Sequence, residues 1–148
     1  MSRLLDLEHF VPFRLNRLAG EISRRLSFVY GERFGIDIPQ WRVIVTLGDG
    51  HNARAQDIAN HTRMHKSSVS RAVSRLIARG LVERSSNDLD RREAPLQLTA
   101  EGERIFAELA PVVLDFEQCF LEGLEIGDRR SLQLLLDRLE RKLGIGDR

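Results

Sequence analysis

The chain has 148 residues, a length suited to one domain with its own hydrophobic core. Hydrophobic residues make up 42% and charged residues 30%, as in soluble globular proteins. No apolar run approaches a membrane span, and the amino-terminal residues lack a signal peptide's apolar core, so we expect a cytoplasmic protein without membrane contact. The single cysteine, Cys119, excludes an intrachain disulfide and a multi-cysteine metal site.

The net charge of +1 conceals an uneven distribution of charge. Residues 54–92 contain nine Lys and Arg against four Asp and Glu, a balance of +5. Residues 100–148 contain seven against eleven, a balance of −4. This asymmetry indicates an anion-binding surface on the middle of the chain.

Residues 4–34 are predicted to form one long helix, because apolar side chains recur at spacings of three and four. Pro12 predicts a kink or a break near its start. The helix is longer than a small domain needs for its own core, so its first turns are candidates for packing on a second subunit. Asp37 and Gln40 then have the spacing of an N-cap and capping box that open the next helix.

The middle of the chain predicts a helix-turn-helix. Residues 54–61 form a short helix, residues 62–65 a turn, and a basic helix follows that ends at Gly80. One stripe of the basic helix is apolar: Val69, Ala72, Val73, Leu76 and Ile77. The opposite face carries short hydroxyl and basic side chains and no carboxylate: Ser67, Ser70, Arg71, Ser74 and Ala78, with Lys66 and Arg75 at its edges.

A hairpin is predicted directly after this helix. Residues 81–84 and 95–99 are β-like, and the charged turn between them carries Arg91 and Arg92. A basic helix fits the major groove of DNA, and an arginine-tipped arm fits the narrower minor groove. The alternative is a solvated amphipathic helix beside a surface hairpin. The coincidence of helix, hairpin and charge favours DNA binding.

The carboxyl-terminal third predicts two more helices. Residues 100–123 form the first, with Thr99 as its N-cap and a kink expected at Pro111, and residues 129–143 form a leucine-rich second. The most economical packing is one dimer interface made by the first and last helices. Two copies would reach two half-sites of a pseudo-palindromic operator. The expected fold is mainly α with a small β-hairpin wing: a winged helix-turn-helix core flanked by amino- and carboxyl-terminal dimerisation helices.

Several motifs resemble the MarR (multiple antibiotic resistance regulator) family of winged-helix transcription regulators. Residues 66–71 read KSSVSR, residues 80–84 GLVER and residues 98–102 LTAEG, and residues 37–43 are similar to the family's second helix. The resemblance covers essentially the whole chain. It implies a single MarR-type domain over 1–148, with a winged-helix DNA-binding region at 36–99 and a helical dimerisation region at 1–34 and 100–148.

The resemblance also implies a function and its residues. It implies a sequence-specific transcriptional regulator, a homodimeric repressor whose binding to double-stranded DNA is relieved by a small, aromatic carboxylate effector. The residues expected to face the major groove or its phosphates are Lys66, Ser67, Ser68, Ser70, Arg71 and Arg75. Arg91 and Arg92 are expected at the minor groove, with Asp90 bracing Arg92. The residues expected to line an effector cleft are Phe10, Phe13, Arg14, Arg17 and Trp41.

The chain departs from the family pattern in two places. Asn87 and Leu89 stand at the wing tip where the family usually has Asp and Arg, which predicts weaker or narrower wing contacts. His65 stands where the family often has an acidic residue that would cap the basic helix, so that helix start is expected to be less firmly held.

Other groups of residues give little indication of a metal site, a reactive thiol or an active site. His61 and His65 have a spacing seen in zinc sites, but no Cys or carboxylate cluster accompanies them, so we expect no metal and no cofactor. Cys119 is expected to be a packed, inert thiol. No catalytic arrangement is visible, so we expect no enzyme. Two alternatives remain: a winged-helix module that binds proteins, and a constitutive DNA binder without a ligand.

Overall fold

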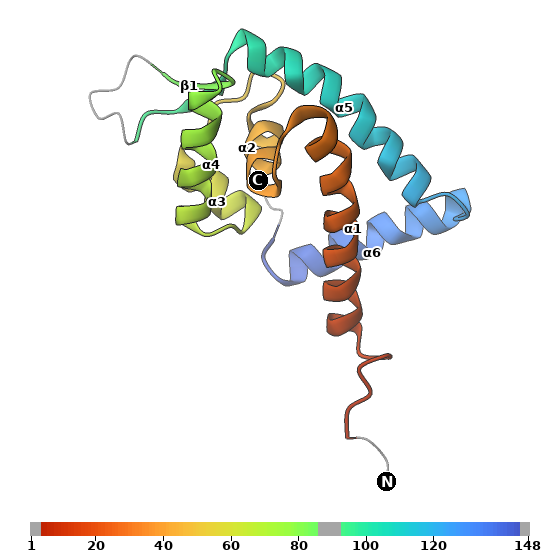
Figure 1. The fold of residues 1–148 in the computed structure, drawn as a ribbon. Coiled ribbons are helices and arrows are strands. Elements are labelled where there is room, and N and C mark those ends of the chain that lie inside the picture. Colours follow the sequence, from red (N-terminus) through yellow and green to blue (C-terminus); the bar gives the residue numbers. More distant parts are fainter. Residues whose placement is uncertain (1–3, 86–92, 146–148) are drawn as a thin grey trace. The chain divides into compact units, whose positions relative to one another are not determined.

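The structure, a computed structural model, describes residues 4–85 and 93–145. These residues form six helices and a two-stranded antiparallel sheet (Figure 1). In chain order the elements are α1 (Val11–Phe34), α2 (Ile38–Leu47), α3 (Ala55–Thr62), α4 (Lys66–Ala78), β1 (Val82–Arg84), β2 (Leu96–Leu98), α5 (Ala100–Phe120) and α6 (Ile126–Lys142). The expected fold class, mainly α with a hairpin wing, is confirmed. The chain divides into two compact units, Met1–Val113 and Leu114–Arg148. None of the helices in the described part is long and apolar enough to cross a membrane.

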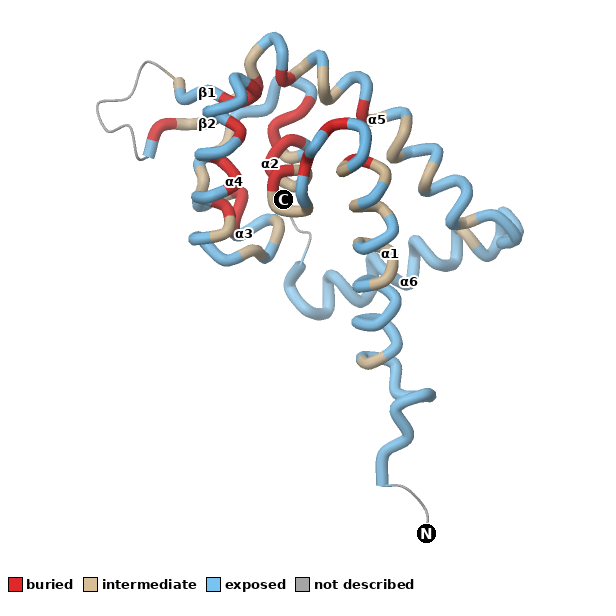
Figure 2. The backbone as a smooth tube through the Cα atoms, in the orientation of Figure 1, coloured by how far each residue is buried: buried red, intermediate tan, exposed pale blue. Residues whose placement is uncertain are grey.

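The hydrophobic core of the first unit is centred on α2, α4 and the hairpin. Figure 2 shows the buried residues gathered on these elements, and α6 in the second unit has none. The core side chains are mainly branched aliphatics: Val43, Ile44 and Leu47 of α2, Ile58 of α3, Val69, Val73 and Leu76 of α4, and Leu81, Val82, Leu96 and Leu98 of the hairpin. Each such side chain contributes about 1.5–3 kcal/mol when fully buried, so this cluster holds the winged helix together.

The start of α1 differs from the expected one. The helix begins at Val11 rather than at residue 4, and Phe10 precedes it without a side-chain cap. Pro12 lies in the first turn, where its missing N–H would have had no intrahelical partner. Pro12 therefore opens the helix, so of the expected kink or break the structure has a break before this residue. At the other end Gly35, with φ 63°, terminates α1 in the left-handed conformation that favours glycine.

The predicted capping box of α2 is confirmed. The Asp37 carboxylate accepts the Gln40 backbone N–H at 2.9 Å, and the Gln40 side chain accepts the Asp37 N–H at 3.1 Å. Pro39 lies in the first turn of the same helix. These local bonds set the direction in which α2 leaves the α1 junction.

The wing is joined firmly to the start of α5. Val82 pairs with Leu98, and a single bridge from Ala53 to Leu96 extends the sheet. Thr99, the predicted N-cap, accepts the Gly102 N–H at 3.0 Å and donates its hydroxyl to the Gly80 carbonyl at 2.6 Å. A Cβ on Gly102 would lie 2.0 Å from the Leu81 carbonyl oxygen, so only glycine permits this approach.

The two carboxyl-terminal helices differ in detail from the predicted ones. Helix α5 ends at Phe120 rather than at residue 123, and Pro111 lies inside it, as expected. Helix α6 begins at Ile126 rather than at residue 129, so Gly127 and Asp128 form its first turn instead of breaking the chain. An acidic side chain in the first turn interacts favourably with the positive end of the helix dipole, which explains why Asp128 is tolerated there.

An aromatic pair joins α1 to α2. The rings of Tyr30 and Trp41 are stacked with centroids 5.4 Å apart and an interplanar angle of 17°. Tyr30 is only 1% exposed. Burial disfavours the phenolate and raises the pKa of Tyr30 to about 12.

This pair permits a direct titration, because Tyr30 and Trp41 are the chain's single tyrosine and single tryptophan. In the folded protein, phenolate absorbance should rise with a midpoint near pH 12 instead of about 10. The raised pKa contributes stability that is complete below pH 10 and is lost as the pH rises through 12, so Trp41 fluorescence should change together with the phenolate signal. The control is the guanidinium-unfolded protein, with a midpoint of about 10. A folded-state midpoint near 10 would contradict the prediction.

Candidate nucleic-acid interface

The helix-turn-helix expected in the middle of the chain is formed by α3 and α4. Arg63 terminates α3 in the left-handed region with φ 57°, and the Met64 N–H bonds to the Ala59 carbonyl at 3.1 Å. His65 precedes α4 as its N-cap but makes no side-chain capping bond, in agreement with the sequence expectation for this end. The tight turn therefore places α4 directly after α3.

The two faces of α4 have opposite environments. Val69, Ala72, Val73 and Leu76 are 0–2% exposed, whereas Ile77 of the predicted stripe is 37% exposed. The hydroxyl and basic side chains lie outward: Ser67, Ser70, Arg71, Ser74 and Arg75 are exposed, and Ser68 is half-buried. The helix contains no carboxylate, so its outward face offers only hydroxyl and cationic groups to a partner.

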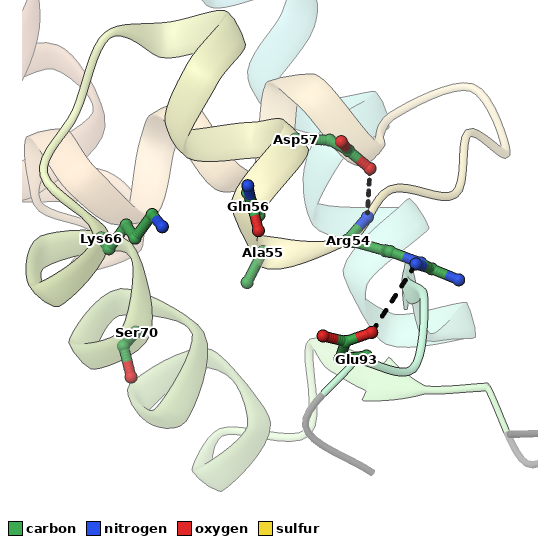
Figure 3. A pocket seen from close by; sticks show the side chains of 7 residues that line it. All are labelled: Arg54, Ala55, Gln56, Asp57, Lys66, Ser70 and Glu93. Carbon is green, nitrogen blue, oxygen red and sulfur yellow. Dashed lines mark hydrogen bonds and ion pairs between the residues drawn. The ribbon is translucent and has the colours of Figure 1, made fainter. Parts of the chain in front are cut away.

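A hollow of about 490 Å³ adjoins this face (Figure 3). Its lining comes from the start of α3, the first turns of α4 and the residue after the undescribed wing tip: Arg54, Ala55, Gln56, Asp57, Lys66, Ser70 and Glu93. The Arg54 guanidinium lies 3.9 Å from the Glu93 carboxylate. Sequence reasoning missed Arg54, Gln56 and Glu93. Their position, at the start of the first helix of the helix-turn-helix and at the base of the wing, could have indicated that they lie near the DNA-binding face.

Arg71 and Arg75 share a helix but differ in their partners. Arg75 Nη1 lies 3.2 Å from Asp37 Oδ2 at the start of α2. Arg71 has no ion pair among residues 4–85 and 93–145. A small hollow of about 60 Å³ is lined by both arginines together with Asp37. Among residues 4–85 and 93–145, Arg75 thus has a carboxylate partner, whereas Arg71 has none.

The wing is described only at its base. Glu83 of β1 accepts a hydrogen bond from the Gln97 side chain of β2 at 2.7 Å. The predicted minor-groove residues Arg91 and Arg92, the bracing Asp90, and the departures Asn87 and Leu89 lie outside the described residues.

The predicted effector group is split along α1. Phe13 and Arg17 form one pair, with the guanidinium 5.2 Å from the ring centroid, and Arg17 also pairs with Glu8 at 3.2 Å. Phe10 and Arg14 lie in the same amino-terminal part, whereas Trp41 stacks on Tyr30. A helix rises 1.5 Å per residue, so residues 13 and 30 are about 25 Å apart. One chain therefore does not bring the five expected residues together, because Phe13 and Tyr30, on which Trp41 stacks, lie near opposite ends of α1.

The remaining candidates are outside this surface. Within the part of the chain that the structure describes, no group of three or more His, Cys, Asp and Glu is placed to hold a metal ion. Cys119 is exposed in the single chain, so the expectation of a packed thiol was wrong. The reason is that the end of α5 has little packed on it, and the neighbouring Phe120 is exposed as well.

Comparison with known proteins places this arrangement in a family. The model of the MarR family matches residues 34–93, which include the helix-turn-helix. The HTH-type transcriptional regulator FarR of Neisseria gonorrhoeae is 33% identical over 108 residues, or 73% of this chain and 72% of that protein.

Solved structures agree over nearly the full chain. A MarR/EmrR family regulator from Acinetobacter sp. ADP1 superposes with a TM-score of 0.84 at 25% identity and covers 95% of this chain and 99% of that one. NadR, solved in complex with 4-hydroxyphenylacetate, has a TM-score of 0.73 at 26% identity and covers 97% and 96%. The resemblance noted in the sequence is confirmed: this chain belongs to the MarR family, and it is a DNA-binding transcriptional regulator rather than an enzyme.

Proposed function

We propose that the protein is a homodimeric repressor that binds a pseudo-palindromic operator and leaves it when a small effector binds. Residues 36–99 contact the DNA, and residues 1–34 and 100–148 hold the two subunits together. The observation that carries this proposal is the outward, carboxylate-free face of α4, which lies opposite the buried side chains of Val69, Ala72, Val73 and Leu76.

The exposed residues of α4 suit distinct DNA contacts. A guanidinium reads guanine edges with two hydrogen bonds, which suits Arg71, and serine hydroxyls contact bases or phosphates, which suits Ser67, Ser68 and Ser70. Lys66, which lines the hollow in Figure 3, is a phosphate contact. Arg91 and Arg92, with Asp90 bracing the second, remain predictions for the minor groove.

The homodimer is supported by apolar surface that one chain leaves uncovered. The exposed large apolar residues of α1 include Val11, Leu15 and Leu18. Those of α6 are Ile126, Leu132, Leu134, Leu135, Leu136 and Leu139. Contiguous exposed apolar surface marks an interaction site, and a two-fold pair of winged helices matches two half-sites about one helical turn apart.

An aromatic carboxylate is the effector class that the residues support. NadR was solved with 4-hydroxyphenylacetate, which has a ring and a carboxylate. Arginines beside aromatic rings bind such a molecule through paired charges and stacking. Because Phe10, Phe13, Arg14 and Arg17 are distant from Trp41 within one chain, the proposed cleft needs residues of both subunits.

The two alternatives predict different behaviour. A winged helix that binds proteins would not need an acid-free recognition face, so that face favours DNA. A constitutive DNA binder would share the operator contacts but would show no response to an effector.

Replacing Arg71 by Ala should abolish binding to DNA from the protein's own promoter region, or weaken it by about 1–3 kcal/mol. Gel shifts over a range of salt measure this loss, and the log–log salt slope should fall by up to about 0.9 if Arg71 neutralises one phosphate. Sedimentation should show an intact dimer. The control is Arg104→Ala, since Arg104 pairs with Glu101 and Glu108 on its own helix. Unchanged affinity of the Arg71 variant would remove Arg71 from the interface.

Replacing Glu93 by Gln should strengthen DNA binding several-fold, with little change in stability. The Glu93 carboxylate lies 3.9 Å from the Arg54 guanidinium in the hollow beside α4. There it repels phosphates and pairs with a cation that could otherwise bind one. The pair is exposed, so its loss should leave the unfolding temperature almost unchanged. Glu117→Gln, on α5, is the matched charge control. Weaker binding by the Glu93 variant would show that this hollow does not face DNA.

Adding 4-hydroxyphenylacetate should raise the unfolding temperature and release the DNA. An effector at a hundred times its dissociation constant stabilises the folded state by about 2.7 kcal/mol. The uncharged amide of the same compound is the control, because it lacks the carboxylate that Arg14 and Arg17 would bind. If neither this acid nor a panel of related aromatic acids shifts the transition, the constitutive alternative is favoured.

A further inference from the structure

We propose that Arg75 of α4 and Arg79, the C-cap residue of α4, are positioning residues that hold the recognition helix against the junction between α1 and α2. This inference rests on the proposed DNA-binding role of α4. It assigns Arg75 to an intramolecular contact instead of the DNA contact that the family resemblance implies, and it gives a role to Arg79.

Arg79 binds the end of α1. Its Nη2 donates to the Phe34 carbonyl at 2.8 Å, and its Nη1 donates to the Gly35 carbonyl at 3.1 Å. The last carbonyls of a helix have no intrahelical donor and form the negative end of its dipole. The planar guanidinium satisfies two carbonyls at once, which a lysine ammonium cannot do with the same geometry.

Arg75 binds the start of α2, one helical turn before Arg79. Its Nη1 donates to Asp37 Oδ2 at 3.2 Å, while Asp37 Oδ1 accepts the Gln40 N–H of the capping box. Residues 34–37 therefore receive both arginines, and these residues are the link between α1 and α2. Residues four apart lie on the same helical face, so the two bonds hold α4 in one orientation relative to this link.

The position of this link gives the contacts a consequence for DNA binding. Helix α1 carries the exposed apolar residues assigned to the dimer, and α4 carries the residues assigned to the DNA. The arginine contacts connect the two through residues 34–37. They hold each recognition helix at a set angle to the dimer helix and so help to match the spacing of two half-sites.

The two roles for Arg75 predict opposite effects of Asp37→Asn. Asparagine keeps an oxygen that can cap α2 but removes the charge that pairs with Arg75. If Arg75 positions α4 through Asp37, this variant weakens DNA binding. If Arg75 instead binds a phosphate, removing the competing carboxylate strengthens DNA binding. Since an exposed ion pair contributes little to stability, the fold should survive in either case.

The experiment compares the dimeric, full-length wild type with Asp37→Asn, Arg75→Gln and the double variant, in binding to DNA from the protein's own promoter region across a range of salt. We expect each single variant to bind about three- to tenfold more weakly, the double variant to be no weaker than Arg75→Gln, and the salt slope to stay constant. Stronger binding by Asp37→Asn, additive losses, or a slope reduced by about 0.9 in Arg75→Gln would overturn the inference.

Conservative variants separate positioning from general structural damage. Arg75→Lys should restore most of the affinity when Asp37 is present and none of it in the Asp37→Asn background, whereas loss of folding would follow neither pattern. Arg79→Met should weaken binding with an unchanged salt slope. Arg71→Ala in the same assay separates a failure of the proposed DNA-binding role of α4 from a failure of the positioning role. If Arg71→Ala has no effect, the proposed role of α4 fails and this inference fails with it. If it abolishes binding while Asp37→Asn has no effect, only the positioning role is wrong.

Discussion

Burial of one apolar stripe on α4 determines how the protein can meet DNA. Val69, Ala72, Val73 and Leu76 pack into the core shared with α2 and the hairpin. Because an α-helix repeats every 3.6 residues, burying this stripe sets the rotation of α4 about its own axis. Ser67, Ser70 and Arg71 must then lie on the outside. The hydrophobic effect thus selects which polar side chains are available to a partner.

Features that depend on near neighbours in the chain could be predicted from the sequence. The capping box at Asp37 and Gln40, the N-cap at Thr99 and the two strands of the wing all depend on local spacing. The first helix shows where local reasoning reaches its limit. The apolar residues before Pro12 continue the helical spacing, but their side chains are exposed in the single chain, and the helix begins at Val11. Spacing alone does not distinguish a proline that opens a helix from one that kinks it.

Features that depend on distant residues could not be predicted in this way. Arg71 and Arg75 are equivalent in the sequence pattern, yet only Arg75 reaches Asp37, which is 38 residues away in the chain. Arg79 likewise meets carbonyls 44 and 45 residues away. The split of the effector group has the same cause, since helical spacing places Phe13 and Arg17 together but says nothing about where Trp41 lies. The sequence pattern of basic residues therefore does not show which of them have partners within the protein.

Helix α1 takes part in every process proposed for this protein. Its amino-terminal half carries apolar residues and the Phe13–Arg17 pair, and its carboxyl-terminal end carries the Tyr30–Trp41 stack and the carbonyls that Arg79 binds. An effector that binds against α1 can change DNA affinity only if it binds one arrangement of the dimer more tightly than another. A tilt of α1 would reach its carboxyl-terminal end, and the contacts at residues 34–37 would carry that tilt to α4. The proposed release of the operator by an effector would then require no change within the winged-helix core, only a change in the angle between the two cores of the proposed dimer.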